Sequence, residues 1–220
     1  MEKFEEKSYH ALYFFLWPFF TLIFYLKNFR RPHAKNVMWL FTVFYAFTYA
    51  IGRESQKSDI VSYMADVPLL HNLKLNFSGL IAHYQSLGEI DILRTVLAYL
   101  VSLFTANGYY LIIVYGIIFG YFYSRNMWYI LDQLKGKTKF FTRVLLFCLF
   151  LNIPIWNLNG FRFWTASHIF LYGLLPYFFE GKKKSLIWCF LTPFVVHYSF
   201  LFALIPLGIY LIFGSKVKFY

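Results

Sequence analysis

An arginine stands at the beginning of an apolar stretch in the segment NLNGFRFWTASH, residues 157–168. The residues just before Arg162 include Asn157, Asn159 and Gly160, which are small or polar. A charge at the edge of an apolar helix is costly when it loses its water. Arg162 therefore either extends its guanidinium group to a polar surface, with its alkyl chain against apolar neighbours, or binds an anionic ligand.

Two further residues, Asp59 and His197, have side chains that can accept a proton. Asp59 is placed to begin a helix, along which Tyr63 and Asp66 would share its face. His197 lies in the segment FVVHYSF, where it interrupts the apolar run of residues 185–213. Each has a plain structural alternative. Asp59 could be only a helix cap, and His197 a turn residue bonded to a backbone carbonyl.

The composition indicates what kind of fold holds these residues. Hydrophobic residues make up 60% of the 220-residue chain and aromatic residues 25%, whereas the charged 14% are too few to cover so many rings in water. Apolar runs recur at residues 9–26, 37–51, 108–123, 140–155, 163–179 and 185–213. A helix needs about 20 apolar residues to cross a bilayer. We therefore expect an all-α, polytopic integral membrane protein, with one transmembrane domain over residues 1–220.

The distribution of the basic residues predicts the topology. The net charge is +11, and many of the basic residues cluster in four short segments between or after apolar runs, residues 27–35, 125–139, 182–184 and 216–218. The positive-inside rule places all four in the cytoplasm, with the N-terminus outside and the C-terminus inside. Residues 52–89 then form an outer loop. Within it we expect a surface helix whose apolar stripe is formed by Ile60, Met64 and Val67.

The stretch after this loop could hold one span or two. Two spans would place the lysines of segment 125–139 outside, so we expect residues 108–123 to form one span and residues 90–104 an interfacial or re-entrant helix. One face of that helix carries Asp91, Arg94, Thr95, Ala98 and Ser102. The count becomes about seven transmembrane helices, with the interfacial or re-entrant helices on the outer face. Gly116 and Gly120 are spaced to let another helix approach closely.

Several other classes of site are disfavoured. The two cysteines, Cys148 and Cys189, lie inside apolar runs and suggest neither a disulfide framework nor a zinc site. His10, His33, His71 and His83 have no ligand spacing, so we expect no metal. The short basic segments between apolar runs argue against a nucleic-acid partner.

Three segments, in this order, carry a resemblance to a known family: GRESQKSDIVSY, then LNGFRFWTAS, then VVHYSFLFAL. Together they resemble the EpsG/Wzy-like family of bacterial polysaccharide polymerases, over roughly residues 37 to 213. Members of that family are usually longer, with more spans after the histidine. The resemblance implies a multi-pass protein of the bacterial inner (plasma) membrane.

The family's activity implies a nucleotide-independent glycosyltransferase that needs no cofactor. Such enzymes transfer a growing O-antigen, capsule or exopolysaccharide chain from its polyprenyl diphosphate carrier to the next lipid-linked unit, at the outer face of the membrane. The partners implied are the polyprenyl-diphosphate-linked oligosaccharide, membrane lipids, and other assembly proteins such as a flippase and a chain-length regulator. Arg162 would bind the diphosphate, and either Asp59 or His197 would be the base.

The remaining site residues follow from that activity. The side chains expected to bind substrate, chiefly through sugar hydroxyl groups, are Arg53, Glu54, Tyr63, Asn157 and Asn159. Two alternatives stay open: a membrane-bound O-acyltransferase that modifies surface glycans, and a flippase or transport component for lipid-linked sugars. A transporter should carry ionisable residues near the bilayer midplane and often has internal repeats, and the sequence has neither feature.

Overall fold

The structure, a computed structural model, describes residues 12–31, 33–52, 59–88, 92–134, 136, 139–152 and 160–214. All regular secondary structure in this part of the chain is helical, which confirms the all-α class. The chain divides into two compact units. The first unit comprises Met1–Ser62 and Tyr109–Phe161, and the second comprises Tyr63–Gly108 and Arg162–Tyr220.

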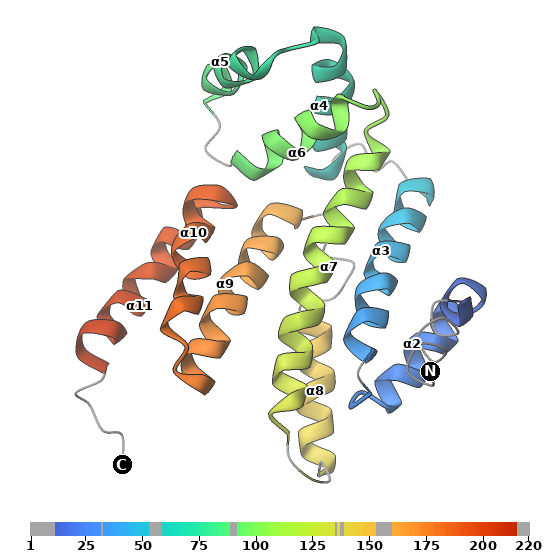
Figure 1. The fold of residues 1–220 in the computed structure, drawn as a ribbon, viewed down its shortest axis with the longest axis vertical. Helices are drawn as coiled ribbons and strands as arrows, with labels where there is room; N and C mark the ends of the chain where they lie inside the picture. The colour runs from blue at the N-terminus through green and yellow to red at the C-terminus, as the bar shows by residue number, and fades with distance from the viewer. Residues whose placement is uncertain are drawn as a thin grey trace, which may run out of the picture. The chain divides into compact units, whose positions relative to one another are not determined.

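The first unit is built on two helices that pack along each other. Its helices are α2 (Pro18–Lys27), α3 (Ala34–Gly52), α7 (Tyr109–Asp132) and α8 (Phe140–Asn152). Helices α3 and α7 lie side by side, and α2 packs against α3 (Figure 1). A Cβ atom added to Gly116 would collide with Ala46, and one added to Gly120 would lie 2.7 Å from the Cβ of Thr42. The predicted close approach at these two glycines is therefore confirmed.

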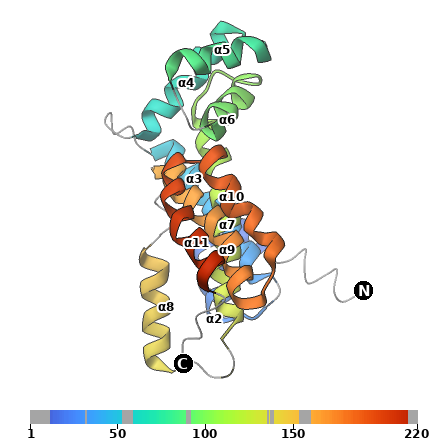
Figure 2. The same ribbon diagram turned by 90° about the vertical axis from the view of Figure 1, so that its left-hand side faces the viewer.

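The second unit contains two groups of helices. The first group is α4 (Asp59–Leu73, whose first residues belong to the first unit), α5 (Phe77–Leu87) and α6 (Ile92–Ser102), which lie near one another in both views (Figures 1 and 2). The second group is α9 (Phe161–Glu180), the 3₁₀ turn η2 (Lys183–Ser185), α10 (Leu186–Val195), the 3₁₀ turn η3 (Tyr198–Phe200) and α11 (Leu201–Phe213). Helices α9, α10 and α11 share a core that includes Phe170, Leu186, Cys189 and Leu207.

Local sequence explains where several of these helices begin and end. The side chain of Asn76 accepts a hydrogen bond from the Gly79 amide at 2.8 Å and so caps α5 at its start. Gly88 ends the same helix with a φ of 63°, a left-handed conformation that glycine adopts without strain. His197 interrupts the last apolar run as predicted, because α10 ends before it and η3 begins after it.

The predicted membrane topology is wrong for the part of the chain that the structure describes. Among those residues, none of the helices combines the length and the apolar character that a transmembrane span requires. This finding overturns the seven-span fold and, with it, the multi-pass inner-membrane location with the N-terminus outside and the C-terminus cytoplasmic.

The reason differs between the short and the long helices. Helix α10 has 10 residues and α11 has 13, because the apolar run of residues 185–213 is divided at His197. Both are shorter than the roughly 20 residues that a span needs. Helices α3, α7 and α9 are long enough, with 19, 24 and 20 residues, but polar or weakly apolar residues are spread along them. In α7, for example, six tyrosines, Arg125, Asn126 and Asp132 lower the mean hydropathy.

Helix α6 forms where residues 90–104 were expected to be helical, and its orientation is informative. The face with small and polar residues is buried, with Ala98 at 0%, Ser102 at 3% and Thr95 at 8% exposure. The aliphatic residues Leu97 and Val101 are buried beside them, each at 8% exposure, whereas Leu100 is exposed. The inward face of α6 therefore combines small and polar residues with aliphatic ones, and the small residues let it approach its neighbours closely.

Candidate functional site

Two of the predicted site residues, Tyr63 and Arg162, are in contact with each other in the second unit, where Tyr63 lies on α4. The Tyr63 side chain is buried, with 3% exposure. The Nε atom of Arg162 donates a hydrogen bond to its hydroxyl oxygen at 2.9 Å, and the guanidinium carbon of Arg162 lies 5.4 Å from the ring centre. The sequence named both residues as site residues, and the structure brings them into direct contact.

A second arginine approaches the same ring from α6. The guanidinium carbon of Arg94 lies 4.8 Å from the centre of the Tyr63 ring. Its Nε and Nη2 atoms also donate hydrogen bonds to Asp66 Oδ2, at 3.2 and 2.6 Å. The side chains of Arg94 and Asp66 are 12% and 29% exposed, so this ion pair is well shielded from water. Asp66 follows Tyr63 by three residues, which places both side chains on one side of α4.

Contacts between α4 and α6 hold Asp66 opposite Arg94. The ring Nδ1 of His71, on α4, lies 2.6 Å from the backbone oxygen of Ser102 at the end of α6. The Tyr99 hydroxyl donates to the Leu75 carbonyl at 3.2 Å. After α6 the chain passes against the backbone of Met64, where only a residue without a side chain fits, and this residue is Gly108. The ion pair is therefore positioned by packing on both sides of it.

The arrangement suits the binding of an anion. Two guanidinium groups from different helices converge on one aromatic ring, and Arg162 is only half-buried, so solutes can reach it. Arginine binds phosphate and carboxylate groups through paired hydrogen bonds. Contact with an aromatic face adds a cation–π attraction and fixes the plane of the guanidinium group. Tyr63 therefore orients both cations.

His197 lies near the first turn of α9, which carries Arg162. Its ring meets the Phe163 ring edge-on, with centroids 6.0 Å apart and an angle of 84°. The backbone at His197 is extended, with φ at −157° and ψ at 115°, and its amide donates to the Thr192 carbonyl at 3.1 Å. The side chain is half-buried. His197 and Arg162 thus belong to the same unit.

A second histidine on α9 has a different environment. His168, six residues after Arg162, has no exposed surface, and burial lowers the pKa of its imidazole to about 3. At neutral pH this ring is uncharged.

Asp59 begins α4 four residues before Tyr63, so the two residues lie on the same side of this helix, and Asp59 is exposed. Four predicted site residues lie outside the described part of the chain: Arg53, Glu54, Asn157 and Asn159. Within the described ranges, no three His, Cys, Asp or Glu side chains gather as metal ligands would.

Sequence reasoning did not assign the pair Asp66 and Arg94 to the site. A signal was present, because Arg94 is the one charged residue within Ile92–Ser102 and Asp66 follows Tyr63 at helical spacing. An isolated charge on an otherwise uncharged helix needs a partner of opposite sign. Comparison of the chain with models of protein families, with curated proteins and with solved structures finds no match. The family resemblance therefore stays a prediction.

Proposed function

We propose that this chain is a nucleotide-independent glycosyltransferase of the polysaccharide polymerase type. It would transfer a growing glycan from a polyprenyl diphosphate carrier to the next lipid-linked repeat unit. The observation that supports this most directly is the convergence of Arg94 and Arg162 on Tyr63. A diphosphate leaving group needs cations at fixed positions, and this cluster supplies Arg162 together with Arg94, whose charge is shared with Asp66.

The reaction sets the roles of these residues. The bond between the donor sugar's anomeric carbon and the diphosphate oxygen breaks, and negative charge develops on the departing diphosphate. Arg162 and Arg94 would stabilise that charge, which is the kind of interaction that contributes most to catalysis. The acceptor sugar's hydroxyl group attacks the anomeric carbon and gives its proton to a general base. Because contacts in the folded protein already fix these arginines, ordering them during the reaction costs less free energy than ordering mobile side chains would.

Either His197 or Asp59 would be the base. His197 lies in the same unit as Arg162, beside Phe163 in the first turn of α9. Asp59 lies four residues before Tyr63 on α4. Tyr63 has its hydroxyl bonded to Arg162, so its proposed role becomes the positioning of that cation in addition to contact with the sugar. Hydrogen bonding of the sugar by Glu54, Asn157 and Asn159, and substrate binding by Arg53, remain part of the proposal.

Replacement of Arg162 tests the proposal. Lysine keeps the charge but cannot lie flat over the Tyr63 ring and donate sideways to its hydroxyl. We expect Arg162→Lys to reach normal abundance but to shorten the surface glycan strongly, and Arg162→Ala to abolish its polymerisation. The measurement is the length distribution of the surface glycan on a gel, in a deletion strain that expresses each variant at a matched level.

Arg125 provides a matched control in the first unit. Its guanidinium carbon lies 4.8 Å from the centre of the Tyr121 ring, and its Nη2 atom donates to Asn36 at 2.8 Å. Arg125→Lys should therefore disturb a similar contact but leave the glycan ladder at full length. A full ladder from Arg162→Lys would contradict the diphosphate role. In the deletion strain, complete loss of the glycan would indicate a flippase, and an unchanged ladder without acetyl groups would indicate an acyltransferase.

A further inference from the structure

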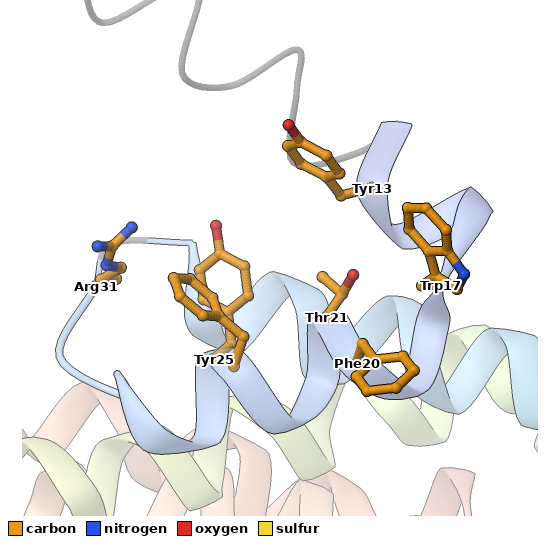
Figure 3. A pocket seen from close by; sticks show the side chains of 7 residues that line it. Tyr13, Trp17, Phe20, Thr21, Tyr25 and Arg31 are labelled. Carbon is orange, nitrogen blue, oxygen red and sulfur yellow. The ribbon is translucent and has the colours of Figure 1, made fainter.

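A pocket lies on the first unit, and none of the residues that line it belongs to the candidate site. Its volume is about 310 Å³, and it is formed by α2 with the residues just before and after this helix (Figure 3). The lining residues are Tyr13, Trp17, Phe20, Thr21, Phe24, Tyr25 and Arg31. This volume is near the lower end of the range for small-molecule sites in proteins.

Helical spacing and a tight turn build this pocket. The residues that line it from α2 recur every three or four positions after Trp17, so they lie on one side of the helix. Beyond α2, the Arg31 amide donates to the Asn28 carbonyl at 2.9 Å, which folds the chain back. The guanidinium carbon of Arg31 consequently lies 5.0 Å from the centre of the Phe24 ring.

The pocket is apolar along its length and cationic at one end. Figure 3 shows Trp17 and Tyr13 at one end, Arg31 at the other, and Tyr25 and Thr21 between them. Tyr25 and Thr21 are buried, with 2% and 7% exposure, whereas Trp17 is 58% exposed. A ligand that covers the exposed rings would gain hydrophobic free energy from the area removed from water.

The positive charge of residues 12–31 favours a negatively charged ligand. Residues 12–31 contain Lys27, Arg30 and Arg31 and no acidic residue. Arg30 is directed elsewhere, because its Nη2 atom donates to the Gly136 carbonyl at 2.6 Å. Arg31 is exposed and is the charged residue that lines the pocket. Its planar guanidinium group can form paired hydrogen bonds with a carboxylate or a phosphate.

We propose that this pocket binds an amphipathic anion, with an apolar chain against the aromatic rings and an anionic head group on Arg31. The head group is a carboxylate, as in a fatty acid, or a phosphate monoester, as in an alkyl or prenyl phosphate. The inference rests on the first unit alone and does not depend on the proposed glycosyltransferase activity.

Tryptophan fluorescence can measure this binding with three probes that share one alkyl chain. Dodecanoate carries a carboxylate, dodecyl phosphate carries a phosphate monoester, and dodecanol is uncharged. Each is added below its aggregation threshold, and the signal that Trp17→Phe removes is the signal of the pocket. We expect saturable binding of at least one anion, tighter than that of dodecanol by about tenfold or more. The anion that binds more tightly identifies the head group.

Three variants distinguish this site from general adsorption. Arg31→Gln should lower the affinity for the anions about tenfold or more and leave that for dodecanol unchanged. The matched control Lys27→Gln removes an exposed charge that does not line the pocket, and it should leave all affinities unchanged. Thr21→Leu places a larger side chain at the buried part of the pocket and should weaken binding of all three probes.

The proposal fails under any of three results. Dodecanol could bind as tightly as both anions, Lys27→Gln could weaken binding as much as Arg31→Gln, or the Trp17 signal could change with protein concentration in the absence of ligand. The last result would mean that a second copy of the chain covers the pocket. Because Arg31 is exposed, its replacement should not prevent folding, and the test does not depend on the Thr21 variant.

Discussion

The burial of His168 should make the stability of the fold depend on pH. Its side chain has no exposed surface on α9, and burial lowers the pKa of the imidazole to about 3. In the unfolded chain a histidine has a pKa of about 6.5. Between these two values the unfolded chain binds more protons than the folded chain. The stability that comes from keeping the ring neutral is therefore complete above about pH 6.5 and declines as the pH falls toward 3.

The size of the effect follows from the two pKa values. Each pH unit between them changes the free energy of unfolding by about 1.4 kcal/mol. From about pH 7 to about pH 5, His168 should therefore lower the free energy of unfolding by about 2 kcal/mol. A loss of that size is a large fraction of the 5–15 kcal/mol typical of folded domains.

The assay compares three proteins by urea denaturation, followed through helical circular dichroism at both pH values. The variant His168→Gln removes the titrating ring, and Ser167→Ala is a matched change at the neighbouring position, where the hydroxyl donates to the Phe163 carbonyl at 2.9 Å. We expect the wild type and Ser167→Ala to lose about 2 kcal/mol more than His168→Gln on acidification. If the wild type and His168→Gln show the same pH dependence, the reasoning from burial is refuted.

Two further predictions concern packing and thiol reactivity. Gly120→Ala places a methyl group 2.7 Å from Thr42, so it should lower the free energy of unfolding by about 1–3 kcal/mol. The control Gly208→Ala, with open space around the added atom, should raise it by about 0.5–1 kcal/mol, and a loss there as large as at Gly120 would contradict the packing argument. Burial raises the pKa of the Cys189 thiol to about 12, whereas Cys148 is exposed. Maleimide at neutral pH should therefore label one site per folded chain, read by mass spectrometry, and Cys148→Ser should abolish that labelling; labelling of Cys189 without unfolding would contradict its burial.

The helical periodicity of the sequence predicted several elements correctly. Ile60 and Val67 of the predicted apolar stripe are buried on α4, at 2% and 0% exposure, and Met64 between them is half-buried. The break at His197 and the close approach at Gly116 also appear as expected. The sequence signal of each consists of residues within a few positions of one another. Local spacing therefore carried enough information to predict them.

Which apolar runs form continuous helices, and how long those helices are, could not be predicted in the same way. Composition indicates how much apolar surface the chain has, but not which runs become continuous helices. The run of residues 185–213 divides into α10 and α11, and the run 108–123 extends through Arg125 to Asp132 as α7. Because hydrophobic counting treats tyrosine-rich and aliphatic runs alike, it overestimated the number of helices able to cross a membrane.

In the candidate site too, the sequence predicted individual residues but not the contacts between them. Arg162 was identified from its residue type and its place at the beginning of an apolar run, and Tyr63 from the activity that the family resemblance implies. Their contact joins positions 99 residues apart, and the pairing of Asp66 with Arg94 joins positions 28 apart. The isolated charge of Arg94 indicates that it needs a partner, but the sequence does not identify either pairing, because each depends on how separate helices pack.

The contact with Tyr63 changes how the two interpretations of Arg162 should be weighed. An arginine that only extends its charge to water needs length and flexibility, and its aromatic neighbours are incidental. Arg162 instead donates through Nε, the nitrogen nearest its backbone, to the hydroxyl of a buried ring over which its guanidinium group lies. A bond from this nitrogen fixes the plane of the whole group and hence the directions of its remaining N–H donors. Fixed directions bring no advantage to a charge that only needs water, but they suit paired hydrogen bonds to an anion. Arg94, against the same ring, is already paired with Asp66, so the charge left for a bound anion is that of Arg162.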